Sequence, residues 1–267
     1  MIWNLVLKTI KARRGQWVAF CVLGFLFLIL YLATFPAVQK SSADYDKIIS
    51  TLPKGVLSVF NITESVPTLM GYLSSKHFGF LWALMIIILI SSYSSFAIAK
   101  EVENRTLGFL LSRPISRLQF YLSRFLTGLV GLIIFIVFTE LTTYPLAQIF
   151  GYSASFIEIL NIAILGAFFG FAVLGLGLMF SALSSESSKS TGYLSTILLI
   201  MYVAYIIASL EPRLEFLQNL SIFYYFRPGD LVAGSGLSPS SLAILASTGL
   251  IGTLIGAFIF NKRDLDV

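Results

Sequence analysis

The chain has 267 residues, of which 57% are hydrophobic and only 12% are charged, and its net charge is +5. Soluble domains usually carry about 25% charged residues, so this composition excludes an ordinary soluble protein and indicates one that lies in a bilayer. The positive charge is therefore interpreted by its position, as a guide to topology, before nucleic-acid binding is considered. The one cysteine, Cys21, lies in an apolar run and is expected to be a packing residue.

The first predicted element is a basic, amphipathic segment over residues 1–16. Trp3, Val6, Leu7 and Ile10 follow the i, i+3, i+4, i+7 spacing of one helix face, and polar residues occupy another face. This pattern is typical of a helix that lies in the headgroup plane, where Trp3 would anchor it. A basic leader that sets topology by charge alone is the alternative.

Six apolar segments follow, each near the roughly 20 residues that a membrane helix needs. They cover residues 17–35, 78–99, 118–140, 159–183, 191–209 and 242–260. An even number of spans puts both termini on one side, and a cytoplasmic N-terminus would place 12 of the 18 Lys and Arg residues inside. The first segment is too long for the apolar core of a signal peptide and has no A-x-A-like site, so we expect an uncleaved anchor.

A run of serines in span two and two pairs of glycines in spans four and six each allow more than one interpretation. Ser91, Ser92, Ser94 and Ser95 place hydroxyl groups on every face of the inner half of span two. These hydroxyls either bond to helix backbone or a neighbouring helix, or line a polar path for substrate. The G-x-x-x-G pairs at 166–170 and 252–256 predict close helix packing, and whether it lies within or between subunits stays open.

Two ionisable residues, Glu140 and His77, are candidates for chemistry within the spans. Glu140 lies about 23 residues after the expected start of span three, or ~35 Å along a helix, which is beyond a ~30 Å hydrocarbon core. We therefore predict that it lies at the outer interface, with a proton or cation role as the alternative. His77, at the outer edge of span two, is expected at a solvated loop end, and the sequence has no H-E-x-x-H motif.

The longest interruption by charge is "KEVENRTLGFLLSRPISR", residues 100–117. Glu101 and Arg105 have the favourable i, i+4 order, and Leu107, Leu110 and Leu111 form an apolar stripe, so a short helix is predicted over 101–112. The leucines are either the anchor of a docking surface for another protein or side chains that dip into the membrane interface.

Residues 113–119 predict a sharp break followed by a new helix. Pro114 cannot continue the first helix, and Ser116 with Gln119 has the spacing of a capping box. The next helix should therefore begin at Arg117 and run into span three.

The whole pattern is shared with one membrane-protein family. It consists of Glu101, Glu103, Thr106, Leu107, Leu110, Leu111, Pro114, Ile115, Ser116 and Arg117. It closely resembles the signature of ABC type-2 exporter permeases, the membrane subunits of exporters driven by separate ATPase subunits. Arg105 stands where that family commonly has Gly, and Gly108 and Phe109 stand where Glu and an aliphatic residue are common.

The resemblance extends over most of the chain. Residues 220–236 look like the family's segment of short helices between the last two spans, which implies a re-entrant external segment over 210–241. The ending "FNKRDLDV", with Phe260, Arg263 and Asp264, is similar to the family's usual C-terminus. The segment 1–16 is similar to its connecting helix.

The resemblance implies that residues 100–114 form a cytoplasmic coupling helix, which sits in a cleft of a nucleotide-binding subunit. The residues implied to couple to the ATPase are Glu101, Glu103, Arg105, Thr106, Leu107, Leu110, Leu111, Arg113 and Pro114. The implied partners are two ABC ATPase subunits and a second permease, either a copy in a homodimer or a homologous chain. Because G-x-x-x-x-G-K-[ST] is absent, ATP and Mg²⁺ are expected in the partner, with no cofactor, metal or nucleic acid bound by this chain.

The sequence therefore predicts an all-α integral membrane protein of the plasma membrane, with both termini cytoplasmic. Residues 17–267 form its six-span domain, with an external segment over 36–77, and the expected function is the permease subunit of an ATP-driven exporter. An ATPase-independent channel or secondary transporter is the alternative, although it would need intramembrane charges or interrupted helices that these spans almost lack. A lipid-modifying enzyme would need catalytic groups within the spans.

Overall fold

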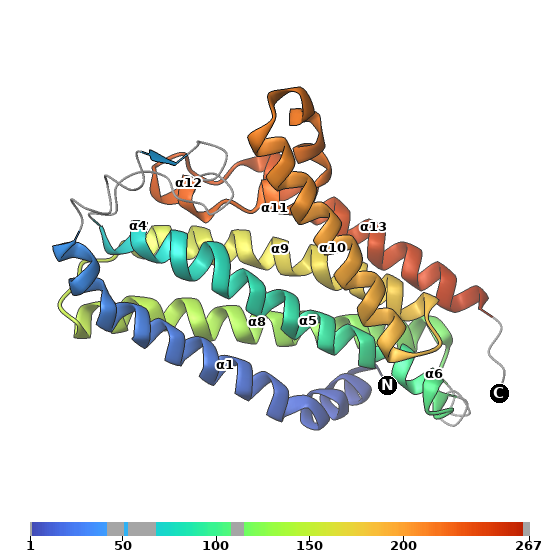
Figure 1. Cartoon of the computed structure of the whole chain (residues 1–267). Coiled ribbons are helices and arrows are strands. Elements are labelled where there is room, and N and C mark those ends of the chain that lie inside the picture. The colour runs from blue at the N-terminus through green and yellow to red at the C-terminus, as the bar shows by residue number, and fades with distance from the viewer. Residues whose placement is uncertain (1, 42–50, 53–67, 108–114, 264–267) are drawn as a thin grey trace.

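The computed structural model describes residues 2–41, 51–52, 68–107 and 115–263, and regular structure in these ranges is helical (Figure 1). Six long helices dominate, and short helical segments flank the second and join the last two. In chain order the elements are α1 (Ile2–Lys40), α4 (Leu69–Leu73), η1 (Ser74–Trp82), α5 (Ala83–Ala97), α6 (Ala99–Glu103), α8 (Arg117–Ile149), α9 (Phe156–Leu183), α10 (Ser187–Leu210), η2 (Pro212–Leu220), α11 (Ile222–Tyr225), α12 (Pro228–Val232) and α13 (Pro239–Lys262).

The six predicted apolar segments are confirmed as helices. Each lies within one of the six candidate spans, which cover Trp3–Lys40, Leu69–Glu103, Arg117–Ile149, Phe156–Leu183, Ser187–Leu210 and Pro239–Lys262. The second candidate span contains α4, the π-helical segment η1, α5 and α6 in succession. The all-helical, six-span fold predicted from the sequence is therefore the fold of this chain.

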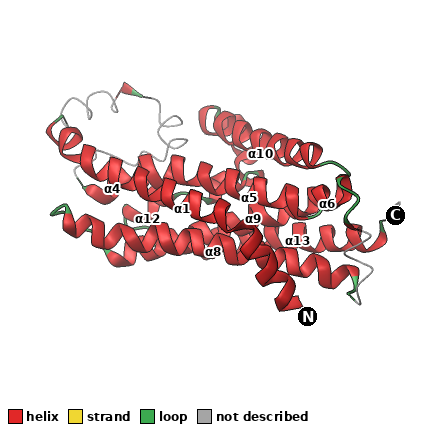
Figure 2. Cartoon of the chain, turned by 90° about the horizontal axis from the view of Figure 1, so that it is seen from below, coloured by secondary structure: helices red, strands yellow, loops and turns green. Residues whose placement is uncertain are grey.

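The predicted N-terminal interfacial segment and the first span share one helix. At 39 residues α1 is about 58 Å long, roughly twice the thickness of a hydrocarbon core. Figures 1 and 2 show that α1 bends near its N-terminus. Within the predicted apolar stripe, Val6 is buried against the rest of the protein, whereas Trp3 and Leu7 are exposed. An interfacial position for residues 1–16 stays a prediction.

Helix α9 lies at the centre of the bundle and contacts α13, α8, α5 and α10. Helix α1 packs along α8, while α10 lies at one flank and is the least buried of the six candidate spans (Figure 2). The outward faces of α10 and α13 expose large apolar side chains, including Leu199, Ile200, Leu254 and Phe258. Exposed side chains of this kind suit helices that face lipid.

Glycines allow α9 and α13 to touch along their backbones. A Cβ atom on Gly175 would lie 2.1 Å from the carbonyl oxygen of Gly249, and one on Gly252 would lie 2.7 Å from the carbonyl carbon of Gly175. Further along the same interface, a Cβ on Gly256 would lie 2.9 Å from the Cα of Met179. The predicted close packing of the 252–256 pair therefore occurs within the chain.

Trp82, the last residue of η1, fixes the second span to its neighbours. Its indole Nε1 donates to Thr139 Oγ1 of α8 at 2.9 Å, and its ring fills the space left by Gly166 of α9. The ring also stacks on Phe135 and Phe226. The glycine of the 166–170 pair thus makes room for a side chain of the same chain.

The solvated position predicted for His77 is wrong, whereas the outer-interface depth predicted for Glu140 stays a prediction. Both side chains are 0% exposed, and none of their side-chain nitrogen or oxygen atoms has a hydrogen-bond partner within the described structure. The residue count from Arg117 gave the depth of Glu140 along the helix, whereas its burial depends on which face of α8 packs inward. His77 lies in η1, with its ring centroid 5.4 Å from that of Tyr31.

Candidate functional site: the junction at the end of span two

The segment predicted to couple to an ATPase begins at a turn between α5 and α6. Ile98 lies between these helices and leaves the helical conformation, with φ −131° and ψ −54°. The backbone N–H groups of Ile98 and Ala99 donate to Ser181 Oγ of α9, at 3.3 and 3.0 Å. Because a buried N–H without an acceptor is costly, this serine stabilises the break and fixes it to α9.

The continuous helix predicted over residues 101–112 is interrupted. Helix α6 ends at Glu103, and Arg105 adopts the left-handed conformation with φ 55°. The N–H of Thr106 donates to the carbonyl of Glu101, and that of Arg105 to the carbonyl of Val102, each at 3.0 Å. These two bonds form a Schellman motif, in which the left-handed position is usually Gly.

The left-handed turn is one that glycine would suit at position 105. The resembled family commonly has Gly there, and glycine adopts positive φ without the steric cost that a Cβ introduces. The sequence does not predict the turn, because Arg105 is a good helix former and carries no stop signal. Of the other predicted coupling residues, Leu107 is buried, and Leu110, Leu111, Arg113 and Pro114 lie outside the described residues.

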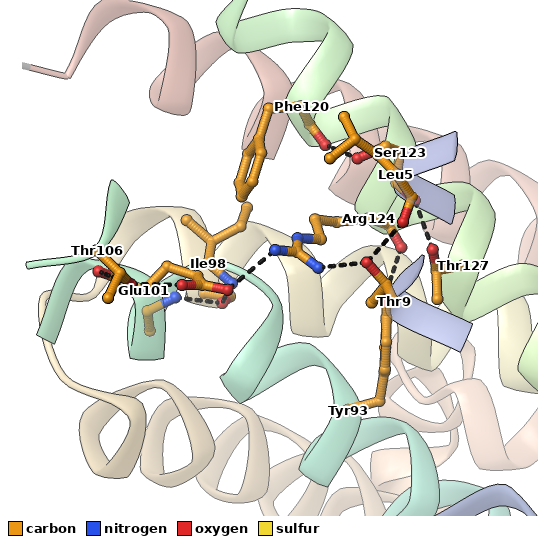
Figure 3. A network of polar contacts seen from close by, with 12 residues as sticks. Leu5, Thr9, Tyr93, Ile98, Glu101, Thr106, Phe120, Ser123, Arg124 and Thr127 are labelled. Atoms are coloured by element: carbon orange, nitrogen blue, oxygen red, sulfur yellow. Dashed lines mark hydrogen bonds and ion pairs between the residues drawn. The ribbon is translucent and has the colours of Figure 1, made fainter. Parts of the chain in front are cut away.

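Glu101 has a different partner from the one predicted. Its Oε1 accepts from Arg124 Nη2 of α8 at 2.9 Å, and its Oε2 accepts from Thr106 Oγ1 at 2.5 Å (Figure 3). The predicted pair of Glu101 with Arg105 is therefore replaced by a pair between two helices. The structural reason is the turn, because Arg105 no longer continues the helix on which an i, i+4 pair depends.

Arg124 joins four helices at this junction (Figure 3). Its Nη1 donates to Thr9 Oγ1 of α1 at 2.7 Å, and its backbone carbonyl accepts from the hydroxyl of Tyr93 of α5 at 2.5 Å. Its guanidinium carbon also lies 4.7 Å from the centroid of the Phe120 ring. Together with the Glu101 carboxylate of α6, these contacts connect α1, α5, α6 and α8.

The pair formed by Arg124 and Glu101 is shielded from water. The two side chains are only 10% and 26% exposed. Charge-assisted hydrogen bonds are stronger than neutral ones, and removal of one member of a buried pair leaves the other charge poorly solvated, at a cost of about 3–5 kcal/mol when burial is complete. The partial exposure of Glu101 places the cost here below that range.

A sequence signal for Arg124 existed. It is a charged residue inside an apolar run that becomes a span, and such residues are functional candidates by default. Above, Arg124 counts only as one of the charges that set the topology. Glu103, which was predicted as a coupling residue, lies at the end of α6 and accepts hydrogen bonds from Lys100 and Ser187.

The serines proposed for a substrate path lie mostly inside the chain. Ser91, Ser94 and Ser95 are buried, and Ser92 is partly exposed. Ser94 Oγ donates to the carbonyl of Ile90 at 2.8 Å, and Ser95 Oγ to that of Ser92 at 3.1 Å. Two of the four hydroxyls thus bond to their own helix, as the packing interpretation expects, and a substrate path stays a prediction.

An apolar groove of about 240 Å³ lies between η1 and α5 on one side and α10 and α11 on the other. Phe80 and Leu84 line the first wall, and Leu199, Tyr202 and Phe223 line the second. Helix α10 therefore forms much of one wall of this groove.

The fold and the junction together define a class of protein. Six apolar helices of spanning length, with a short helix and turn bonded to three of them after span two, describe a multi-pass membrane protein. The profile of a family described as "ABC-2 family transporter protein" matches residues 3–265. The chain belongs to this family and is a permease component of an ABC transporter. No curated protein matches it.

Proposed function

We propose that this chain is the membrane-spanning subunit of an ATP-driven exporter and that residues 100–114 couple it to two separate ATPase subunits. Two permeases, either identical or homologous, would form the pathway in the plasma membrane. ATP and Mg²⁺ would bind to the ATPases. Membership of the ABC-2 family supports a permease that depends on such partners.

The junction of Figure 3 is the observation that carries this proposal. A segment that only connected two spans would need no shielded ion pair, yet Glu101 of α6 is paired with Arg124 of α8. Arg124 in turn bonds Thr9 of α1. A displacement of residues 100–114 would therefore be passed directly to α8 and α1.

The mechanism follows from these connections. Nucleotide binding would draw the two ATPases together and move the docked segments with them. The turn at Ile98 and the pair with Arg124 would then tilt spans two and three, so that substrate is released outward or to the outer leaflet. The two states of such a transporter must differ in their contacts for ATP to bias one over the other.

The distribution of charge supports cytoplasmic termini. Twelve of the 18 Lys and Arg residues would lie inside in this orientation. Glu101 of α6 pairs with Arg124, and Arg263 bonds the end of α9 and the start of α8. All three residues thus lie at the end of the bundle that carries α6, which we call the α6 end (Figure 1). An ATPase in the cytoplasm would then reach residues 100–114 directly.

Docking can be tested by co-purification of an affinity-tagged chain from its native membranes. We expect an ATPase to accompany the wild-type chain and to be lost in Leu110→Asp. The matched control is Lys189→Asp, which introduces the same group at the α6 end on an exposed side chain. Wild-type chain that purifies without an ATPase and still transports would favour a channel or secondary transporter. Equal ATPase recovery from Leu110→Asp and the control would refute docking at this segment.

The variant Glu101→Ala, in the same complex, tests whether a displacement of residues 100–114 is passed to α8. We expect the ATPase to remain bound, because the pair with Arg124 faces the membrane helices rather than solvent. Hydrogen exchange over residues 117–124 should change on addition of ATP and vanadate in the wild type and not in the variant. An unchanged response in Glu101→Ala would contradict the proposed path through Arg124.

A further inference from the structure

Helix α10 begins without a cap from its own sequence. The first N–H groups of a helix have no acceptor within it and are usually satisfied by a side chain of the preceding residue. Here the preceding residue is Glu186, whose side chain makes no capping bond and pairs with Lys189 Nζ at 2.6 Å. The acceptor for the start of α10 must come from elsewhere.

Glu103 supplies that acceptor from α6. Its Oε2 accepts from the backbone N–H of Ser187 at 2.9 Å and from the hydroxyl of the same residue at 2.7 Å. Its Oε1 accepts from Lys100 Nζ at 2.7 Å, which holds the carboxylate in place. A negative charge at a helix N-terminus also interacts favourably with the helix dipole. The two residues are 84 positions apart, so this cap is a tertiary contact.

The position of α10 makes this contact important. It is the least buried of the six candidate spans and lies at one flank of the bundle (Figure 2). Its long-helix neighbours are α9 and α5, and Arg124 makes no bond to it in Figure 3. Apolar packing on α5 fixes mainly the area in contact, so a displacement of span two sets the position of α10 only where a directional bond joins the two.

We propose that Glu103 is a positioning residue that passes the displacement of residues 100–114 to α10. The two glutamates of the segment thus have separate roles, since Glu101 moves α8 and α1 and Glu103 moves α10. Because α10 forms one wall of the apolar groove and α5 the other, the width of this groove follows the position of Glu103. This inference rests on the proposed function and extends it to a span that the chain does not join to the segment.

Two variants distinguish a Glu103 that only caps α10 from a Glu103 that also passes a displacement to it. Glu103→Ala removes both the cap and the connection to α6. Glu103→Ala combined with Glu186→Asp restores a cap at the position where helices usually carry one, without a connection to α6. Lys100→Ala is the control, because it removes the partner of Oε1 and leaves the bonds of Oε2 to Ser187 in place.

Two measurements are made on the complex purified with its ATPase. Hydrogen exchange of the first turn of α10 reports the cap, and we expect it to be about five- to tenfold faster in Glu103→Ala and restored in the double variant. Spin labels at Leu84 and Leu199, both exposed, report the width of the groove in a Cys21→Ala background. ATP and vanadate should shift this distance in the wild type and in Lys100→Ala, and in neither variant that lacks Glu103.

The outcomes distinguish the two proposals. A double variant that recovers both the exchange rate and the distance shift would overturn the inference, because Glu103 would then be a cap and nothing more. A normal shift in Glu103→Ala would overturn it as well. A wild-type distance that does not respond to ATP and vanadate would also overturn the inference, whereas a wild-type chain that purifies without an ATPase would count against the proposed function.

Discussion

The contact of α9 with α13 leads to a prediction that the structure makes quantitative. In Gly175→Ala the new methyl group would lie 2.1 Å from the carbonyl oxygen of Gly249, about 1.3 Å short of ordinary van der Waals contact. Two of its three nearest atoms would be the backbone carbon atoms of Gly249, at 2.8 Å. Since backbone cannot rotate away as a side chain can, the two helices must separate.

The cost can be worked out from two opposing effects. Overpacking of a well-packed interior typically costs about 1–3 kcal/mol, and contact with backbone places this site at the upper end of that range. Alanine in place of glycine within a helix gains about 0.5–1 kcal/mol. We therefore expect Gly175→Ala to lower the free energy of unfolding by about 2–2.5 kcal/mol.

The assay is reversible unfolding of the purified chain in detergent, with Gly192→Ala as the matched control. Gly192 also lies in a long helix, α10, but a Cβ there would meet no atom within 4 Å. The control should gain stability by about 0.5–1 kcal/mol, because only the backbone effect applies. If Gly175→Ala is as stable as Gly192→Ala, the two helices do not touch as described and the reasoning is refuted.

Two further predictions concern a strained residue and a buried acid. Arg105→Gly should raise the free energy of unfolding by about 0.5–1 kcal/mol. The left-handed conformation costs about 1–2 kcal/mol for a residue with a Cβ, and glycine removes this cost. The greater freedom of glycine in the unfolded chain offsets part of the gain in stability. Thermal unfolding measures the change. The control is Arg213→Gly, at an exposed residue with negative φ, which should lose stability. A loss of stability in Arg105→Gly would contradict the left-handed turn. Glu140→Met should raise the free energy of unfolding by about 1–3 kcal/mol, because it removes a buried polar group that has no partner. A loss of stability in Glu140→Met, with Glu158→Met unchanged, would reveal a partner for the carboxyl group and favour the proton or cation role.

Local patterns in the sequence predicted the helices and one of their ends. Runs of apolar residues are long enough to mark all six spans, because a bilayer imposes a minimum length on each. The capping box of Ser116 with Gln119 is confirmed, since the bonds it needs lie within one turn of α8. Features set within a few residues were therefore accessible from the sequence.

Features that depend on how helices face one another were not accessible from the sequence. Arg124 lies 23 positions after Glu101, and the two side chains meet only because the fold brings the end of span two close to α8. Burial of Glu140 likewise depends on the face that α8 turns inward. Apolar runs carry little information about this direction, because a span is hydrophobic on its lipid-facing side as well.

The α6 end of the bundle is held by directional bonds that extend beyond the junction. Arg263 Nη1 donates to the carbonyl oxygens of Ala182 and Ser184 at the end of α9, each at 2.8 Å. Its own carbonyl accepts from Arg117 Nη1, at the start of α8, at 2.6 Å. These bonds connect α8, α9 and the end of α13 in the way that Arg124 connects α1, α6 and α8.

Hydrogen bonds fix both distance and direction, whereas apolar packing fixes mainly the area in contact. At the opposite end the contacts include aromatic ones, such as the edge contact of Phe35 with Tyr152, whose ring centroids are 5.2 Å apart. We therefore expect the α6 end to move as a unit and the opposite end to rearrange by sliding. In that arrangement Glu103 decides whether α10 belongs to the unit, because its carboxylate provides the cap that joins α10 to α6.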